Sequence, residues 1–207
     1  MHNVTVDSTS IGCLCAAPPH RLVTCGLGED VALVRSSLTG VVEATLVGHT
    51  AELLPLLCPL TDGSEWLLSG DGAGAIVAHD LGVAHDGASL SPIREYAGHT
   101  DAVLSIVELS GGRFASASEC GIVRMWAIES DGSIATLRGR TCTFTNALAA
   151  ADEVTLVSGG EDGVLQLWDT RSYAAVIETP APVRALLSLT DGTLASGHGD
   201  GVVRLWD

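Results

Sequence analysis

Short apolar or alternating stretches, separated by turns, follow one another along the whole chain. Residues 41–47 (VVEATLV) alternate apolar and polar side chains, and residues 53–60 (LLPLLCPL) form a continuous apolar run. Runs of this length bounded by Asp-Gly and similar turn dipeptides are typical of β-strands, and no segment has convincing helical periodicity. The pattern therefore predicts an all-β protein. A polar, glycine-rich stretch at residues 81–92 interrupts it and predicts an exposed loop.

One pattern recurs five times and groups the predicted strands into units. Its best copies are residues 158–169 (SGGEDGVLQLWD) and 196–207 (SGHGDGVVRLWD), and weaker copies are residues 116–127, 69–80 and 24–35. The residues at the Trp position are Val34, His79, Trp126, Trp168 and Trp206, so the period is roughly 40 residues. Gly48-His49, Gly98-His99 and Gly139-Arg140 stand at one corresponding place upstream of three copies.

Gly-His followed by Trp-Asp at this period resembles the WD-repeat (WD40) family over nearly the whole chain. The resemblance implies a β-propeller, with blades of four antiparallel strands around a central channel. We expect a single propeller domain of five blades, at about residues 7–47, 48–97, 98–138, 139–178 and 179–207. The last unit has three predicted strands, and in this family an N-terminal strand commonly completes the last blade. Residues 2–6 are therefore expected to pair beside residues 202–206; an open or truncated propeller is the alternative.

The resemblance also implies a hydrogen-bonded network of Trp, Ser or Thr, His and Asp within each blade. The residues that carry it over are His49, Ser69, His99, Ser116, Trp126, Ser158, Asp162, Trp168, Ser196, Asp200 and Trp206. No unit is complete: the second has His79 and Ala73 at the Trp and Asp positions, the third has Cys120 at the Asp position, the fourth has Arg140 at the His position, and the fifth has no His. Because an unpaired buried polar group costs about 1–3 kcal/mol, incomplete networks predict less rigid blades.

The acidic composition narrows the classes of partner. The chain has 25 acidic and 10 basic residues, all of the latter Arg, and a formal net charge of −15. Proteins that bind nucleic acid carry basic stripes, and the scattered Arg residues of this chain form none. The absence of Lys excludes a P-loop and Schiff-base chemistry. No apolar run reaches the roughly 18 residues of a membrane span, and the N-terminus lacks a signal-peptide pattern. We therefore expect an intracellular protein, cytoplasmic or nuclear, with a basic protein or peptide partner and neither a nucleic-acid nor a membrane partner.

Three features bear on catalysis or metal binding. His, Ser and Asp recur together, but a trio that recurs in each unit is explained by packing, whereas a nucleophile is needed once. His79-Asp80 and His85-Asp86 suggest a metal site, although His79 occupies a Trp position. The six cysteines include no C-x-x-C pair, so reduced thiols are expected; Cys13 and Cys15 share one strand face, a hint of metal or redox chemistry without a second pair. We expect no catalytic residue, metal or other cofactor.

The resemblance places partners on the face that bears the entry to each first strand and the turn before each third strand. The matching positions are Glu52, Leu54, Ala102, Leu104, Glu119, Thr143, Thr145, Glu161, Pro182, Arg184 and His198. Apolar anchors within a charged rim suit protein recognition. The favoured interpretation is a non-enzymatic interaction scaffold within a larger complex. The alternatives are a structural subunit that assembles through open propeller edges and a metal-dependent enzyme that uses the 79–86 loop.

Overall fold

The computed structural model describes residues 11–60, 64–130, 132–139, 144–169 and 172–207. The chain divides into two compact units, Met1–Val103 and Leu104–Asp207. The described strands form five predominantly antiparallel sheets, and one pairing in the first sheet is parallel. The all-β class predicted from the sequence is thus confirmed.

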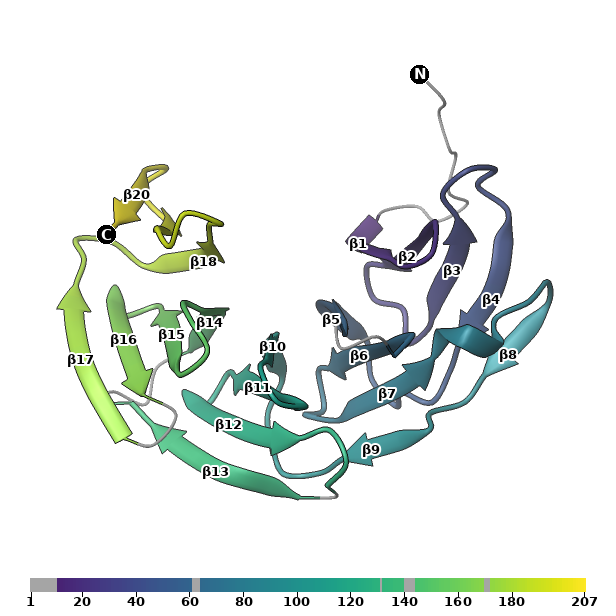
Figure 1. Cartoon of the computed structure of the whole chain (residues 1–207), viewed down its shortest axis with the longest axis horizontal. Coiled ribbons are helices and arrows are strands. Elements are labelled where there is room, and N and C mark those ends of the chain that lie inside the picture. Colours follow the sequence, from purple (N-terminus) through teal and green to yellow (C-terminus); the bar gives the residue numbers. More distant parts are fainter. Residues whose placement is uncertain (1–10, 61–63, 131, 140–143, 170–171) are drawn as a thin grey trace. The chain divides into compact units, whose positions relative to one another are not determined.

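Two sheets make up the first unit (Figure 1). The first contains, in spatial order, β1 (Ile11–Ala17), β2 (Arg21–Gly26), β3 (Ala32–Ser36), β4 (Val42–Leu46) and β8 (Ala88–Leu90). The second contains β5 (Leu53–Pro59), β6 (Trp66–Asp71), β7 (Ile76–Asp80) and β9 (Arg94–Tyr96). Alternate residues of β2 and β3, among them Val23 and Val34, share one buried cluster with Leu53 and Leu67 of the second sheet. Successive side chains of a strand point to opposite faces of the sheet, so each sheet has one face that packs against the neighbouring sheet.

Residues 81–92, predicted to be an exposed loop, are exposed over most of their length, but the prediction of an irregular loop is wrong. The segment begins with a 3-10 helix, η1 (Leu81–Val83), continues into β8, and β8 pairs in parallel with β4 of the preceding repeat, whereas β9 pairs with β7 (Figure 1). Leu81 and Leu90 are buried in the cluster between the two sheets. The segment is ordered because it buries two leucines and satisfies backbone groups of β4 that would otherwise lie at a sheet edge.

Three sheets make up the second unit. Their strands are β10 (Val103–Leu109), β11 (Arg113–Ser118), β12 (Ile122–Ala127) and β13 (Ser133–Arg138); β14 (Thr145–Ala150), β15 (Thr155–Gly160), β16 (Val164–Asp169) and β17 (Ser172–Glu178); and β18 (Val183–Ser188), β19 (Leu194–His198) and β20 (Val203–Trp206). The middle sheet packs on both sides. Leu156 of β15 lies in a cluster with residues of β11 and β12, and its neighbour Val157 lies in another with Val183 and Leu194.

The last sheet has three strands within the described part of the chain. Residues 2–6, predicted to pair beside its outer strand, lie outside the described residues, so this prediction stays untested. Two apolar side chains of β20, Val203 and Leu205, are 69% and 64% exposed. Opposite neighbours Leu187, Ala195 and Leu205 occupy one row across the three strands, so the row presents an apolar strip on this sheet.

Strand register corrects one equivalence drawn from the sequence. In the fourth repeat, Trp168 lies opposite Leu156 and Ser158 lies opposite Gln166. The Trp position thus lies two residues after the residue that is opposite the Ser position. In the first sheet, Thr24 occupies the Ser position and lies opposite Leu33. The residue at the Trp position is therefore Arg35, which lies opposite Leu22. The turn between β2 and β3 is one residue longer than its counterparts, and a shift of one residue moves a side chain to the other face of the strand.

Candidate functional site: the turn end of the sheets

A backbone hydrogen bond recurs at one end of three sheets. The amides of Gly72, Glu161 and Gly199, in the turn before the third strand, donate to the carbonyl oxygens of Glu52, Phe144 and Pro182 at 3.0, 3.0 and 2.8 Å. Each acceptor immediately precedes the first strand of the same sheet. We call this end of each sheet its turn end, with the turn at residues 72–74 in the first unit and the turns at residues 119–121, 161–163 and 199–201 in the second unit. The bond joins the two places in which the sequence predicted partner-binding residues.

The predicted partner-binding residues differ in exposure. Glu52, Glu119 and Arg184 are exposed, and Ala102, Leu104, Glu161 and Pro182 are half-buried. The side chain of Leu54 and the whole of Thr143 lie outside the described residues. Thr145 and His198 are buried, with 9% and 6% of their surface exposed, so these two do not form part of the predicted surface.

Glu161 is the centre of a polar cluster in the second unit. Its Oε1 atom forms an ion pair with the guanidinium group of Arg184 and accepts a hydrogen bond from Asn146 Nδ2 at 3.3 Å. Asn146 Nδ2 also donates to the carbonyl oxygen of Val183 at 2.9 Å. Asn146 was missed in the sequence because the residue belongs to none of the recurring motifs. Phe144, at the entry to β14, is 45% exposed beside this cluster's turn and was missed for the same reason.

Glu119 stands at the corresponding turn of the preceding repeat, between β11 and β12. It is exposed, and within the described part of the chain no Arg pairs with Glu119 or with Glu52. In the second unit the turn end therefore carries an unpaired negative charge at Glu119 and a paired charge at Glu161, and in the first unit Glu52 is unpaired.

The predicted Trp–Ser contacts are present in the last three repeats. The indole Nε1 atoms of Trp126, Trp168 and Trp206 donate to Ser116, Ser158 and Ser196 Oγ at 2.8, 2.9 and 2.8 Å. Trp126 and Trp168 are buried, so these bonds satisfy indole groups that water does not reach. Asp162 and Asp200 serve differently: each Oδ1 atom caps its own turn by accepting from the backbone amide two residues later, at 3.0 and 3.1 Å.

The second repeat holds a Ser–His–Asp arrangement. His49 Nδ1 lies 3.0 Å from Asp71 Oδ2, and His49 Nε2 lies 2.8 Å from Ser69 Oγ. Asp71 also accepts from the backbone amides of Ala73 and Ala75, so Asp71, and not Ala73, fills the Asp position. Ser69 and Asp71 have no exposed surface, and a substrate therefore does not reach the serine hydroxyl. The trio stabilises the turn end.

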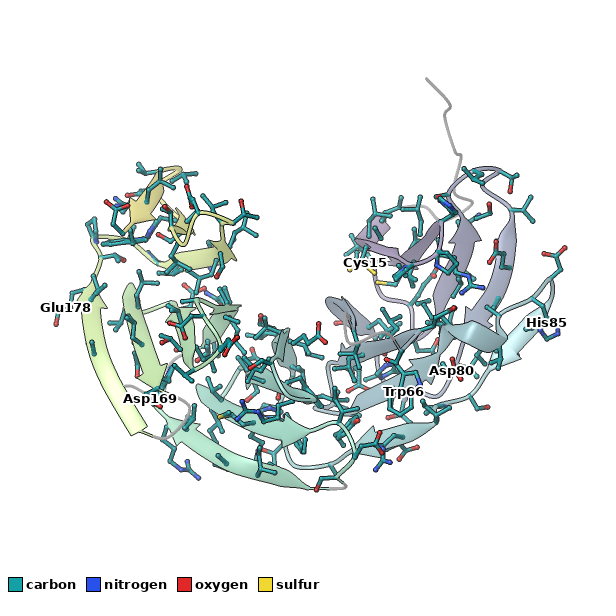
Figure 2. All side chains as sticks on the ribbon, in the orientation of Figure 1. Cys15, Trp66, Asp80, His85, Asp169 and Glu178 are labelled. Carbon is teal, nitrogen blue, oxygen red and sulfur yellow. The ribbon has the colours of Figure 1, made fainter. Side chains whose placement is uncertain are left out.

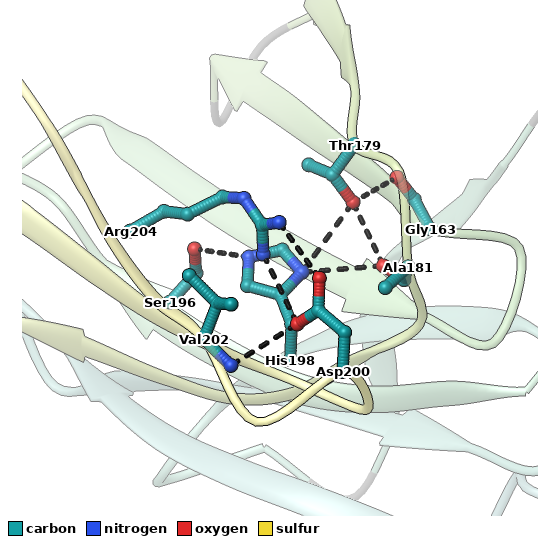
Figure 3. A network of polar contacts seen from close by, with 8 residues as sticks. All are labelled: Gly163, Thr179, Ala181, Ser196, His198, Asp200, Val202 and Arg204. Atoms are coloured by element: carbon teal, nitrogen blue, oxygen red, sulfur yellow. Dashed lines mark hydrogen bonds and ion pairs between the residues drawn. The ribbon is translucent and has the colours of Figure 1, made fainter.

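His198 completes a network in the fifth repeat (Figure 3). Trp206 donates to Ser196 Oγ, Ser196 Oγ lies 2.7 Å from His198 Nε2, and His198 Nδ1 lies 3.2 Å from the carbonyl oxygen of Ala181. A carbonyl oxygen only accepts, so Nδ1 carries the proton and Nε2 accepts from the serine hydroxyl. The fifth repeat thus has a histidine in its network, and the last residue of β19 supplies it rather than a Gly-His dipeptide.

Asp200 lies beside this network and faces Arg204. Its carboxylate forms an ion pair with Arg204 at 2.8 Å, and the hydrogen bond from Arg204 is the main cause that lowers the pKa of Asp200 (Figure 3). Asp200 therefore belongs to the exposed turn and not to the buried network in which the sequence placed it.

The two histidines proposed for a metal-dependent enzyme have separate environments. His79 is fully buried, and its Nε2 atom lies 2.8 Å from the carbonyl oxygen of Val47. His85 is exposed within the inserted segment (Figure 2), with Nδ1 3.0 Å from the carbonyl oxygen of Val83. Among the residues that the structure describes, no three His, Cys, Asp or Glu side chains are grouped as a metal ion requires.

Repeated four-stranded sheets, the Trp–Ser bonds and the Gly-His histidines define a β-propeller of the Trp-Asp repeat class. The family model for the WD domain, G-beta repeat (WD40), matches residues 90–127, 132–169 and 174–207, which together exceed half of the chain. The chain belongs to the WD40 repeat family. Propellers of this family generally serve as scaffolds that bind other proteins.

Two curated proteins are similar to parts of the chain. The DENN domain and WD repeat-containing protein SCD1 of Arabidopsis thaliana is 35% identical over 81 residues, which is 39% of this chain and 7% of that protein. The ribosome biogenesis protein WDR12 homolog of Nematostella vectensis is 32% identical over 91 residues, which is 44% of this chain and 22% of that protein. The matched part is therefore a small fraction of either relative.

Solved structures support the fold over nearly the whole chain. The computationally designed Ika8 protein has a TM-score of 0.76 at 23% identity, covering 95% of this chain and 57% of its own. The WD40 β-propeller domain of Doa1 has a TM-score of 0.76 at 20% identity, covering 94% and 62%. In the described part of the chain, no helix is long and apolar enough to cross a membrane.

Proposed function

We propose that this chain is a non-enzymatic interaction module that binds a basic protein or peptide segment through the turn end of its sheets. The observation that carries the proposal is the exposed, unpaired carboxylate of Glu119. It stands at the turn that corresponds, in the preceding repeat, to the turn of the Glu161–Arg184 pair. A cationic side chain of a partner gains a counter-charge at Glu119 and competes with Arg184 for Glu161. The chain's net charge of −15 adds long-range attraction for such a partner.

The surroundings of these charges suit protein recognition. Phe144 exposes an aromatic ring at the entry to β14, and aromatic residues are enriched at protein interfaces. Asn146 holds the Glu161 carboxylate in place and so limits the entropy lost when a partner binds. Together these residues offer an apolar anchor beside positioned charge.

The test is capture of partners from a lysate by the intact chain and by a Glu119→Arg, Glu161→Arg variant, followed by affinity measurement with the captured protein. We expect at least about a tenfold loss of affinity in the double variant, since each reversed contact is worth on the order of 1 kcal/mol or more. The single variant Glu119→Arg measures the effect of reversing an exposed charge without loss of an ion pair. Glu161→Arg, by contrast, also removes the ion-pair partner of Arg184.

The matched control is Glu129→Arg, Glu153→Arg, which reverses two exposed charges at the opposite end of the same sheets. Its net charge equals that of the test variant, so a general effect of charge weakens both variants alike. Equal binding by the intact chain and the test variant, with both folded by circular dichroism, removes the turn end as the binding surface.

A second candidate function is assembly through the last sheet, which the exposed side chains of Val203 and Leu205 favour. Apolar rows of this kind pack against other sheets. We expect the mass in solution to rise with concentration and a Val203→Glu, Leu205→Glu variant to remain monomeric. A monomer of constant mass over the whole concentration range contradicts this candidate.

A further inference from the structure

Two neighbouring strands place three thiols on one face of the first sheet. Cys13 and Cys15 lie on β1 and Cys25 lies on β2, and all three pack in the same apolar cluster. Figure 2 marks Cys15 on β1. Cys25 is buried, and Cys13 and Cys15 are half-buried, so a small reagent reaches the β1 thiols first. The sequence showed no second pair of cysteines to match Cys13 and Cys15. In the structure, Cys25 of β2 is the thiol that lies beside them.

Strand register selects one pair among the three. Cys13 lies directly opposite Cys25. Opposite residues of an antiparallel pair have Cα atoms about 4.5–5.5 Å apart, within the range of about 4.4–6.8 Å that a disulfide spans. Cys15 lies opposite Val23 and is therefore a diagonal neighbour of Cys25, at about 7–8 Å, where a disulfide requires backbone movement.

A contact between the side chains joins the same two residues. The side-chain hydrogen bond with Cys13, followed by burial, raises the pKa of Cys25 far above its usual range. This hydrogen bond places the Cys25 thiol in contact with Cys13 across the strand pair. By contrast, the thiol of Cys120 contacts a hydroxyl, with Sγ 2.9 Å from Ser118 Oγ.

We propose that Cys13 and Cys25 are a redox-active dithiol that hydrogen peroxide converts to a cross-strand disulfide. The Cys13 sulfur attacks a peroxide oxygen, the O–O bond breaks, and Cys13 sulfenic acid and one water form. The Cys25 sulfur then attacks the Cys13 sulfur, the S–O bond breaks, and a second water leaves with the remaining thiol proton. The two cysteines lose two electrons and the peroxide gains them.

The sequence makes this pair easy to detect. Because the chain has no Lys, trypsin cleaves only after Arg, and Arg21 separates Cys13 and Cys15 from Cys25. After treatment of the folded protein with peroxide, alkylation of remaining thiols and digestion, we expect peptide 1–21 linked to peptide 22–35. The linked mass should disappear on reduction, and fragmentation on either side of Leu14 should assign the link to Cys13.

Two variants and one condition decide the proposal. Cys13→Ser should abolish the link, and Cys15→Ser should retain it. In folded protein, we expect the Cys13–Cys25 link to exceed the Cys15–Cys25 link at least about tenfold, because only the first fits disulfide geometry. In urea the two links should form to similar extents, since they close chain segments of nearly equal length.

Three results overturn the proposal: no linked peptide from folded wild-type protein, a link that survives Cys13→Ser but is lost in Cys15→Ser, or the same ratio of links in folded and unfolded chains. The wild-type comparison between folded and urea-unfolded protein needs no substitution, so it decides the question even where a variant fails to fold. A link between two different molecules, seen as a doubled mass, also counts against it.

Discussion

His79 shows how one residue of a repeat changes its physical behaviour. It stands where three other repeats have Trp, and its Nε2 atom donates to the carbonyl oxygen of Val47 in place of an indole–serine bond. Its Nδ1 atom is buried and has no hydrogen-bond partner within the described residues. Burial is the main cause that lowers the pKa of His79 below 6.5. Protonation would place a donor at Nδ1 without an acceptor, which agrees with this direction.

Substitution of His79 by Gln tests this at the level of folding. The glutamine side chain keeps an amide donor for the Val47 carbonyl oxygen but does not titrate. Because the folded pKa of His79 is lowered, the unfolded chain binds the proton first as pH falls below about 6.5, and the wild type then loses stability that the variant keeps. We expect a constant difference in the free energy of unfolding above pH 6.5 that changes below it by at most about 1.4 kcal/mol per pH unit.

The measurement is urea unfolding of both proteins between pH 5 and 8. The other histidines are common to the two chains, so their contributions cancel in the difference. Parallel stability curves over the whole range would show that His79 titrates alike in the folded and unfolded chains.

At this scale the sequence predicts contacts that recur and misses those that do not. The resemblance to the WD-repeat family predicts the Ser158–Trp168 bond, because both residues belong to the motif that recurs in the last three repeats. The roles of Asp71 and His198 were missed because both stand two residues after the network serine of their repeat, a position that the recurring motif does not include. Asn146 belongs to no repeat motif, and only the fold brings it to Glu161.

Among the elements, the inserted segment departs most from the repeat. Its composition is polar and glycine-rich, yet Asp80 Oδ1 accepts from the Gly82 amide at the start of η1, and leucines near both ends of the segment are buried. The average polarity of the segment does not predict this packing, because two buried leucines are enough to hold the segment against the sheets. Strand pairing with β4 then adds backbone hydrogen bonds that no composition reveals.

Two alanine substitutions in η1 measure this docking. Leu81 is 1% exposed and Val83 is 57% exposed. We expect Leu81→Ala to lower the free energy of unfolding by about 2–5 kcal/mol, because it leaves a cavity between the two sheets. Val83→Ala, the matched control on the same turn of helix, should change it by less than about 0.5 kcal/mol. Urea unfolding gives both values, and two equally small changes would mean that the segment does not contribute to the core.

For the whole molecule, the sequence was most informative about the class of fold. The order of strands and the positions of the turns follow from short apolar runs and Asp-Gly dipeptides, because these act locally. The register of β2 and β3 depends on the length of one turn, and the sequence therefore placed Val34 where the structure places Arg35. Partner-binding residues depend on which turn side chains stay exposed, and this is decided by contacts between segments distant in sequence.

The turn end of the second unit is the surface that we propose binds a basic protein partner. Hydrogen exchange of backbone amides, with and without the partner captured by the intact chain, tests this proposal most directly. We expect slower exchange on binding at residues 119–121, 161–163 and 183–184. No change is expected at residues 110–112 and 151–154, the loops at the opposite end of the same sheets. Protection confined to those opposite loops, with exchange at the turn end unchanged, would show that the partner binds elsewhere.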